Sequence, residues 1–170
     1  MIYLREVNIK DANDLYKITS NERVTKYLGW NPHKNIEETK NIITNFYLTK
    51  KENLKINSQA IVYKENNKVI GIIDLNKIND LVEIGYYLSE DYWSQGIMSQ
   101  ALNLFLDIIF NQLNYDFIHI SHNILNQGSE RVILKNKFTF WKKENRYMKV
   151  KNEKVTLKYY YLKKDDYNGK

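Results

Sequence analysis

The stretch from Tyr92 to Ala101 most constrains what this 170-residue chain can fold into. It joins the extended apolar segment Val82–Leu88 to a long amphipathic segment, and Gly96 lies at its centre. A strand that passes through a glycine turn into a helix leaves unbonded N–H groups at the helix N-terminus, where the positive end of the helix dipole also lies. The pattern predicts a strand-to-helix junction that can bind an anion, although many helix starts look similar.

The rest of the chain predicts helices and strands along its whole length. Runs of β-branched and aromatic residues predict strands over residues 2–7, 59–63, 69–75, 82–88, 117–120, 138–148 and 155–162. Apolar residues at helical spacing predict helices over residues 12–18, 21–28, 36–51, 99–113 and 129–137. Asp11 fits an N-cap, and Asn66-Asn67 fits a tight hairpin turn. This order predicts a mixed α/β fold of the α+β type, with a mostly antiparallel sheet flanked by helices.

Composition narrows the class of protein. Hydrophobic residues make up 43% and charged residues 27% of the chain, as in ordinary folded domains. The lack of cysteine excludes disulfides, thiolate metal ligands and a cysteine nucleophile. Residues 1–30 carry charge throughout, which argues against a signal peptide, and no window approaches the roughly 20 apolar residues of a membrane span. We therefore expect a single domain over residues 1–170 that is cytoplasmic and has no membrane partner.

The net charge of +6 raises the alternative of an RNA-binding protein. Lysines are scattered through the chain, and the tightest clusters are only Lys142-Lys143 and Lys163-Lys164. We do not expect nucleic acid as the main partner, because a positive field serves a polyanionic small ligand equally well.

Five short motifs, in this order, together cover most of the chain. They are Val24-Thr25-Lys26-Tyr27-Leu28, Val69-Ile70-Gly71, Glu83-Ile84-Gly85-Tyr86, Trp93–Ala101, and Asn126-Gln127-Gly128-Ser129-Glu130-Arg131-Val132. Their order and spacing resemble the GNAT superfamily of acetyl-CoA-dependent N-acetyltransferases. Within it, the chain looks most like the branch that acetylates ribosomal-protein N-termini.

The resemblance implies acetyl-CoA as co-substrate and a sheet that splays apart at the cofactor site. It places the cofactor's pyrophosphate against the backbone N–H groups of Gln95, Gly96, Ile97, Met98 and Ser99, within the loop that Trp93 and Ser94 open. It places the pantetheine arm against the backbone of Tyr86, Tyr87 and Leu88. It assigns supporting contacts on the next helix to Asn126, Ser129 and Arg131 or Lys135.

Three positions depart from the family pattern. Ser94 and Met98 stand where the loop has glycine or a small residue, and Ile133 stands where many members have a tyrosine acid. These departures leave open the alternative of a catalytically silent acyl-CoA-binding regulatory module.

Acetyl transfer requires a neutral amine, and a lysine amine or α-amino group is largely protonated at neutral pH. Glu83 is the candidate base, because it lies among apolar residues on the strand that leads to the cofactor loop. Tyr160, flanked by Tyr159 and Tyr161 on the last strand, is the candidate acid.

The resemblance places Tyr27 and Trp30 beside the acceptor, where aromatic rings can hold a cationic amine. The three histidines, His33, His119 and His122, are too dispersed for a metal site, so we expect none. The acceptor implied is a primary amine, on a protein N-terminus or on a small molecule, acetylated by direct transfer in a ternary complex. Some family members form homodimers, and no patch in this sequence demands one.

Overall fold

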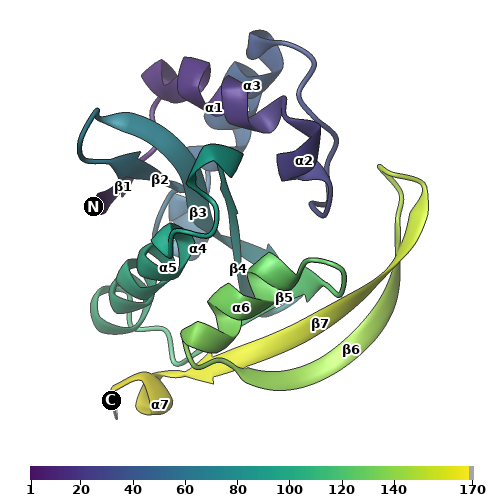
Figure 1. Cartoon of the computed structure of the whole chain (residues 1–170). Helices are drawn as coiled ribbons and strands as arrows, with labels where there is room; N and C mark the ends of the chain where they lie inside the picture. The colour runs from purple at the N-terminus through teal and green to yellow at the C-terminus, as the bar shows by residue number, and fades with distance from the viewer. Residues whose placement is uncertain (169–170) are drawn as a thin grey trace.

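The computed structural model describes residues 1–168 and contains one seven-stranded sheet (Figure 1). Its strands run in the order β1-β2-β3-β4-β5-β7-β6. Their bounds are Ile2–Glu6 (β1), Gln59–Tyr63 (β2), Lys68–Ile78 (β3), Leu81–Leu88 (β4), Phe117–Asn123 (β5), Thr139–Met148 (β6) and Glu153–Lys163 (β7). All neighbouring pairs are antiparallel except β4 and β5, which are parallel. The predicted mixed, mostly antiparallel fold is confirmed.

Helices cover both faces of this sheet. They are α1 (Ala12–Thr19), α2 (Glu22–Thr25), α3 (Ile36–Ile42), α4 (Lys51–Leu54), α5 (Ile97–Asp107), α6 (Gln127–Lys135) and α7 (Lys164–Asn168), with short turns η1 (Ile9–Asp11), η2 (Ile43–Tyr47), η3 (Glu90–Tyr92) and η4 (Ile108–Gln112). In Figure 1, α5 and α6 lie on one face, and α1, α2 and α3 gather beyond the other. Apolar residues of α5, including Leu102 and Phe105, are fully buried in the larger core cluster. Leu15 of α1 and Ile43 of η2 belong to the second cluster.

The two halves of the sheet separate between β4 and β5. Strand β4 pairs with β3 over eight residue pairs, and β5 pairs with β7 over seven. Between β4 and β5, only Glu83 with His119 and Ile84 with Ile120 are paired. Beyond Ile84, the side of β4 that faces away from β3 therefore has no neighbouring strand.

The hairpin of β6 and β7 arches away from the sheet toward the loop after α2 (Figure 1). The Lys151 ammonium donates to the carbonyls of Thr25 and Lys26, and the Asn31 amide donates to the Val150 carbonyl at 3.2 Å. Segments more than a hundred residues apart thus meet at the hairpin tip.

Local chemistry explains where the helices differ from their predicted bounds. The helix expected over 36–51 ends at Tyr47, because π-helical turns over Ile43–Tyr47 follow α3 and close it. Asp11 occupies the predicted N-cap position of α1, but its side chain makes no capping hydrogen bond, because its carboxylate accepts two hydrogen bonds from Arg5 and one from the Asn8 backbone N–H. Asn67 has a φ of 55°, which confirms the predicted hairpin turn.

A buried ion pair joins the helical layer to β3. The Lys50 ammonium donates to the Asp74 carboxylate, to the Leu75 carbonyl and to the Asn76 amide oxygen. Burial lowers the pKa of Lys50, and the opposite charge of Asp74 acts against this. A Cβ added at Gly85 would lie 2.9 Å from the Asn76 amide nitrogen, so this cluster requires a residue without a side chain on β4.

At Gly71 on β3, an added side chain would collide with the backbone of β4. A Cβ there would lie 2.3 Å from the Tyr87 carbonyl oxygen, which is backbone and cannot swing aside. We expect Gly71→Ala to lower the free energy of unfolding by about 3 kcal/mol, at the upper end of overpacking costs. Urea unfolding followed by circular dichroism measures this change.

Gly29→Ala is the matched control, since its Cβ would meet only the Met148 methyl at 4.0 Å. It should change stability by less than about 0.5 kcal/mol. Equal effects of the two substitutions would contradict the argument from close approach.

Candidate active site

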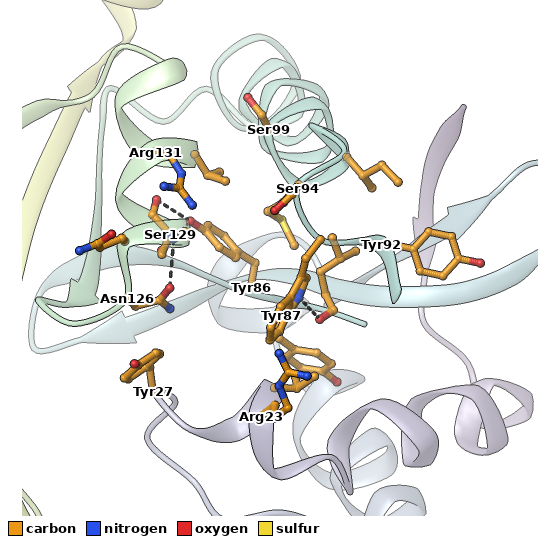
Figure 2. Close-up of a pocket in the computed structure, with 18 of the residues that line it drawn as sticks. Arg23, Tyr27, Tyr86, Tyr87, Tyr92, Ser94, Ser99, Asn126, Ser129 and Arg131 are labelled. Carbon is orange, nitrogen blue, oxygen red and sulfur yellow. Dashed lines mark hydrogen bonds between the residues drawn. The ribbon is translucent and has the colours of Figure 1, made fainter. Parts of the chain in front are cut away.

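A pocket of about 800 Å³ lies where β4 and β5 separate. Three segments besides β4 line it: the loop into α5, the first turns of α6, and the segment from Arg23 to Leu28 (Figure 2). Its floor therefore comes from the strand edge, and two helix N-termini open toward it. The strand-to-helix junction that was predicted to bind an anion therefore lines this cavity.

The loop into α5 depends on two residues with positive φ. Gly96 has φ of 76° and lies immediately before Ile97, the first residue of α5, and Ser94 has φ of 60°. Gly96 meets the conformational need directly, whereas a serine in the left-handed region carries some strain. The N–H groups of Ile97, Met98 and Ser99 lie in the first turn of α5, where the helix supplies no acceptors.

Met98 is larger than the usual loop residue but does not fill the loop. Its side chain turns into the larger core and is 6% exposed. Trp93 supports the loop from outside, since its indole N–H donates to the Leu88 carbonyl at 2.9 Å. The departures from the family pattern at these positions therefore leave the loop open.

The direction of each β4 backbone group follows from the pairing with β3. The Ser89 N–H donates to the Ile70 carbonyl at 2.7 Å, so this pair is hydrogen-bonded. Bonded and non-bonded pairs alternate in an antiparallel ladder, so Tyr87 faces β3, whereas Tyr86 and Leu88 turn their N–H and C=O groups away from it. Of the three residues predicted to bond the pantetheine arm, Tyr86 and Leu88 thus direct backbone groups away from β3, and one of these groups, the Leu88 carbonyl, already accepts from the Trp93 indole. Tyr87 instead presents its ring to the pocket.

The first turn of α6 is tied to β4. The Asn126 side chain caps the helix by accepting from the Ser129 N–H at 3.1 Å, and the Ser129 hydroxyl lies 2.8 Å from the Tyr86 hydroxyl (Figure 2). Burial raises the pKa of Tyr86, so this hydroxyl stays protonated. The helix begins at Gln127, two residues before the predicted start at Ser129.

Charge in the pocket is of one sign. Its described lining includes Arg23, Lys26, Arg131 and Lys135 and contains no carboxylate. Converging cations of this kind suit a phosphorylated ligand. A smaller adjoining hollow, lined partly by Lys135, Asn103 and Gln100, extends the same region along α5.

Most of the residues predicted from the sequence for the cofactor and acceptor meet in this pocket. Those that line it are Tyr27, Tyr86, Tyr87, Leu88, Trp93, Ser94, Gly96, Ile97, Met98, Ser99, Asn126, Ser129 and Arg131. Gln95 does not, because its side chain turns back to donate to the Asp91 carbonyl at 3.0 Å. Trp30 lies behind the lining, edge-on to the Tyr87 ring at 5.6 Å.

Sequence reasoning missed Arg23 in this lining. Its guanidinium pairs with Glu90 at 3.0 Å and lies 6.0 Å from the centre of the Trp93 ring. No local pattern marks it, because Arg23 reaches the loop only through the packing of α2 against η3.

Glu83 lies at the edge of this arrangement, outside the pocket lining. It is in the first of the two β4–β5 pairs, and its side chain shares a sheet face with Tyr87, with Gly85 between them. Its Oε2 atom lies 3.0 Å from His119 Nε2 and accepts from the Ser121 hydroxyl at 3.2 Å. Within residues 1–168, Oε1 receives no hydrogen bond.

Tyr160, the predicted acid, lies elsewhere. Its side chain is 2% exposed, belongs to the larger core and donates to Glu130 at 2.9 Å. Burial and this carboxylate raise the pKa of Tyr160 to about 12. It does not line the pocket, so the geometry gives it no route to a leaving group there.

The described residues offer neither a metal cluster nor a membrane-spanning helix. Residues 1–168 contain no cluster of three or more histidine, aspartate or glutamate side chains placed to bind a metal. Over the same part of the chain, no helix combines the length and apolar character that crossing a membrane requires.

Comparison with known proteins places this geometry in a family. The family model described as acetyltransferase (GNAT) domain matches residues 2–139. An uncharacterized N-acetyltransferase p20 from Bacillus licheniformis is 28% identical over 98% of this chain and 94% of its own length.

Two solved structures share the fold. Spermidine N-acetyltransferase from Vibrio cholerae, in complex with CoA and spermine, has a TM-score of 0.82 at 16% identity, over 98% of each chain. An acetyltransferase from Salmonella typhimurium that modifies the N-terminal serine of ribosomal protein L7/L12 has a TM-score of 0.82 at 21% identity, over 95% of this chain and 94% of its own. The family match and the shared fold agree with the opened sheet and the helix N-termini at the pocket, and this chain therefore belongs to the GNAT acetyltransferases.

Proposed function

We propose that this enzyme transfers an acetyl group from acetyl-CoA directly to a primary amine in a ternary complex. One observation carries the proposal: beyond Ile84, β4 offers a free strand edge inside a pocket lined by four cations and no carboxylate. A ligand with two amides and several phosphates matches such a pocket, because amides pair with a strand edge and phosphates with helix N-termini.

The residues of the pocket fit the parts of the cofactor in order. The first-turn N–H groups of Ile97, Met98 and Ser99 would hold the pyrophosphate. The outward-facing backbone of Tyr86 and Leu88 would bond the pantetheine amides, and Arg131 and Lys135 would face the nucleotide end. Bound there, the cofactor supplies an acetyl thioester as the electrophile.

Glu83 is the group best placed to take a proton from the amine. Its Oε2 is held by neighbours, whereas Oε1 is free to accept from an incoming N–H. Gly85 lies between Glu83 and Tyr87 on that face of the sheet, and the Asn76 and Asp74 side chains of β3 pack over it. We assign no acid, because Tyr160 is turned away and a thiolate leaves readily without one.

The acceptor is a primary amine on a protein N-terminus or on a small molecule. The two structural relatives act on an N-terminal serine and on spermidine, and the shared fold alone does not choose between these classes. Cytoplasmic location remains a prediction from the sequence.

Cofactor binding tests the charge of the pocket. We expect Arg131→Gln combined with Lys135→Gln to weaken CoA binding about tenfold, which corresponds to about 1.4 kcal/mol. Isothermal titration calorimetry at two salt concentrations measures this, and the salt dependence should also decrease. Lys10→Gln with Lys17→Gln on η1 and α1 makes the same change in net charge far from the pocket. An equal loss in that control would mean that only overall charge matters.

The rate of acetyl transfer tests the role of Glu83 as the base. We expect Glu83→Gln to lower kcat by about 100-fold or more, because general-base catalysis contributes about 10² to 10⁴ in rate. Thiol release from acetyl-CoA, with spermidine and with a peptide beginning with serine as acceptors, measures the rate. CoA affinity should stay within twofold, since Glu83 does not line the pocket.

The same experiment addresses the catalytically silent module. That alternative requires CoA binding without transfer to any amine, and with no effect of Glu83→Gln. Transfer that disappears in Glu83→Gln would exclude it.

A further inference from the structure

His119 is a buried histidine that the proposed chemistry has not used. Its side chain is 3% exposed, and Nε2 lies 3.0 Å from Glu83 Oε2. Its other ring nitrogen, Nδ1, is buried and has no hydrogen-bond partner among the described residues. A buried polar atom left without a partner costs about 1–3 kcal/mol, so a histidine here is expensive as a purely structural residue.

The surroundings determine the tautomer. A bare nitrogen lone pair at Nε2 would repel the carboxylate oxygen 3.0 Å away, so Nε2 carries the hydrogen. An imidazolium would place a second N–H at Nδ1, buried and without an acceptor. The tautomer that fits therefore carries its hydrogen on Nε2, on the side of Glu83.

Aromatic rings fix the orientation of the His119 ring. Tyr159 of β7 stacks on it at 6.2 Å and 28°, and Trp141 of β6 meets it edge-on at 6.2 Å and 80°. Three charged groups of β6 lie around these rings. Lys142 and Arg146 lie 5.2 and 5.6 Å from the centre of the Tyr159 ring, and both pair with Glu144. Burial raises the pKa of Tyr159 to about 12, which leaves that hydroxyl neutral.

We propose that His119 is a positioning residue for the base: together with the Ser121 hydroxyl, its Nε2–H holds Glu83 Oε2 so that Oε1 alone meets the amine. The inference rests on the proposed function of Glu83. Because Nε2, the nitrogen that faces Glu83, already carries a hydrogen and has no lone pair to accept another, the proton taken from the amine stays on Glu83. His119 thus acts through geometry and not as a relay.

Three substitutions of His119 distinguish the contribution of its N–H group from the contribution of its aromatic ring. His119→Phe keeps an aromatic ring between Tyr159 and Trp141 but removes the donor. His119→Gln returns an amide N–H at the position of Nε2, three bonds from Cβ, and His119→Asn places it two bonds from Cβ, at the position of Nδ1. We expect His119→Phe and His119→Asn to lower kcat about 10- to 100-fold, as misplacement of a catalytic group by about 1 Å does. The kcat of His119→Gln should stay within about threefold of the native value, because its amide returns an N–H at the position of Nε2.

A double-substitution cycle provides the readout that loss of packing cannot imitate. In the Glu83→Gln background, His119→Phe should lower kcat by no more than about twofold, because residues that act as one unit are non-additive. CoA affinity and the thermal unfolding midpoint are measured for every variant, so that a misfolded protein is recognised. If His119→Phe lowered kcat by the same factor in the native enzyme and in the Glu83→Gln background, the proposal would be overturned.

A second measurement needs no acceptor. The imidazole ¹⁵N chemical shifts of His119 in the ¹⁵N-labelled protein at neutral pH report which nitrogen carries hydrogen. We expect the neutral Nε2–H form, and an Nδ1–H form or an imidazolium would overturn the proposal.

The outcomes distinguish the positioning role of His119 from the proposed role of Glu83 as the base. If Glu83→Gln abolishes transfer and His119→Phe does not affect it, Glu83 is the base and the role of His119 is wrong. If Glu83→Gln retains the native rate, the proposed base is wrong, and the positioning role fails with it. If no amine is acetylated, the ¹⁵N shifts still decide whether His119 donates to Glu83.

Discussion

The separation of β4 from β5 is the constraint on which the rest of this structure depends. Each strand satisfies its backbone with its other neighbour, β4 with β3 and β5 with β7, and the two share only two residue pairs. Unpaired backbone groups in a sheet interior need partners. The outward-facing groups of Tyr86 and Leu88 therefore form part of the binding surface, and the Trp93 indole already satisfies one of them.

This separation also divides the chemistry between the two sheet faces. Toward the face covered by the larger core lie Tyr86, the N-termini of α5 and α6, and the α6 cations Arg131 and Lys135, whereas Arg23 and Lys26 approach the pocket from the segment around α2. Glu83, His119 and Ser121 lie on the opposite face, with Tyr159 and Trp141. In the proposed function, positive charge would meet the phosphates of the cofactor, and the proposed base lies on the other face of the sheet. A single surface holding both would bring the base near the anionic cofactor.

Local contacts support these positions from a distance. Gly71 and Gly85 lack side chains where β3 and β4 approach each other and where the Lys50 and Asp74 cluster packs. The Ser129 hydroxyl meets Tyr86, which ties α6 to the strand edge. The Lys151 contacts hold the β6–β7 hairpin beside the loop after α2.

The sequence by itself determined the order of strands and helices, the loop around Gly96 and most residues of the cofactor pocket, because these depend on spacing within one short segment. Only the tertiary structure decided that Tyr160 faces Glu130 in the core, that Trp30 backs Tyr87, and that Gln95 turns to Asp91. It alone brought Arg23 and His119 to the site. Which face of a strand is buried, and what packs against it, depends on segments far apart in the chain, and local pattern does not contain that information.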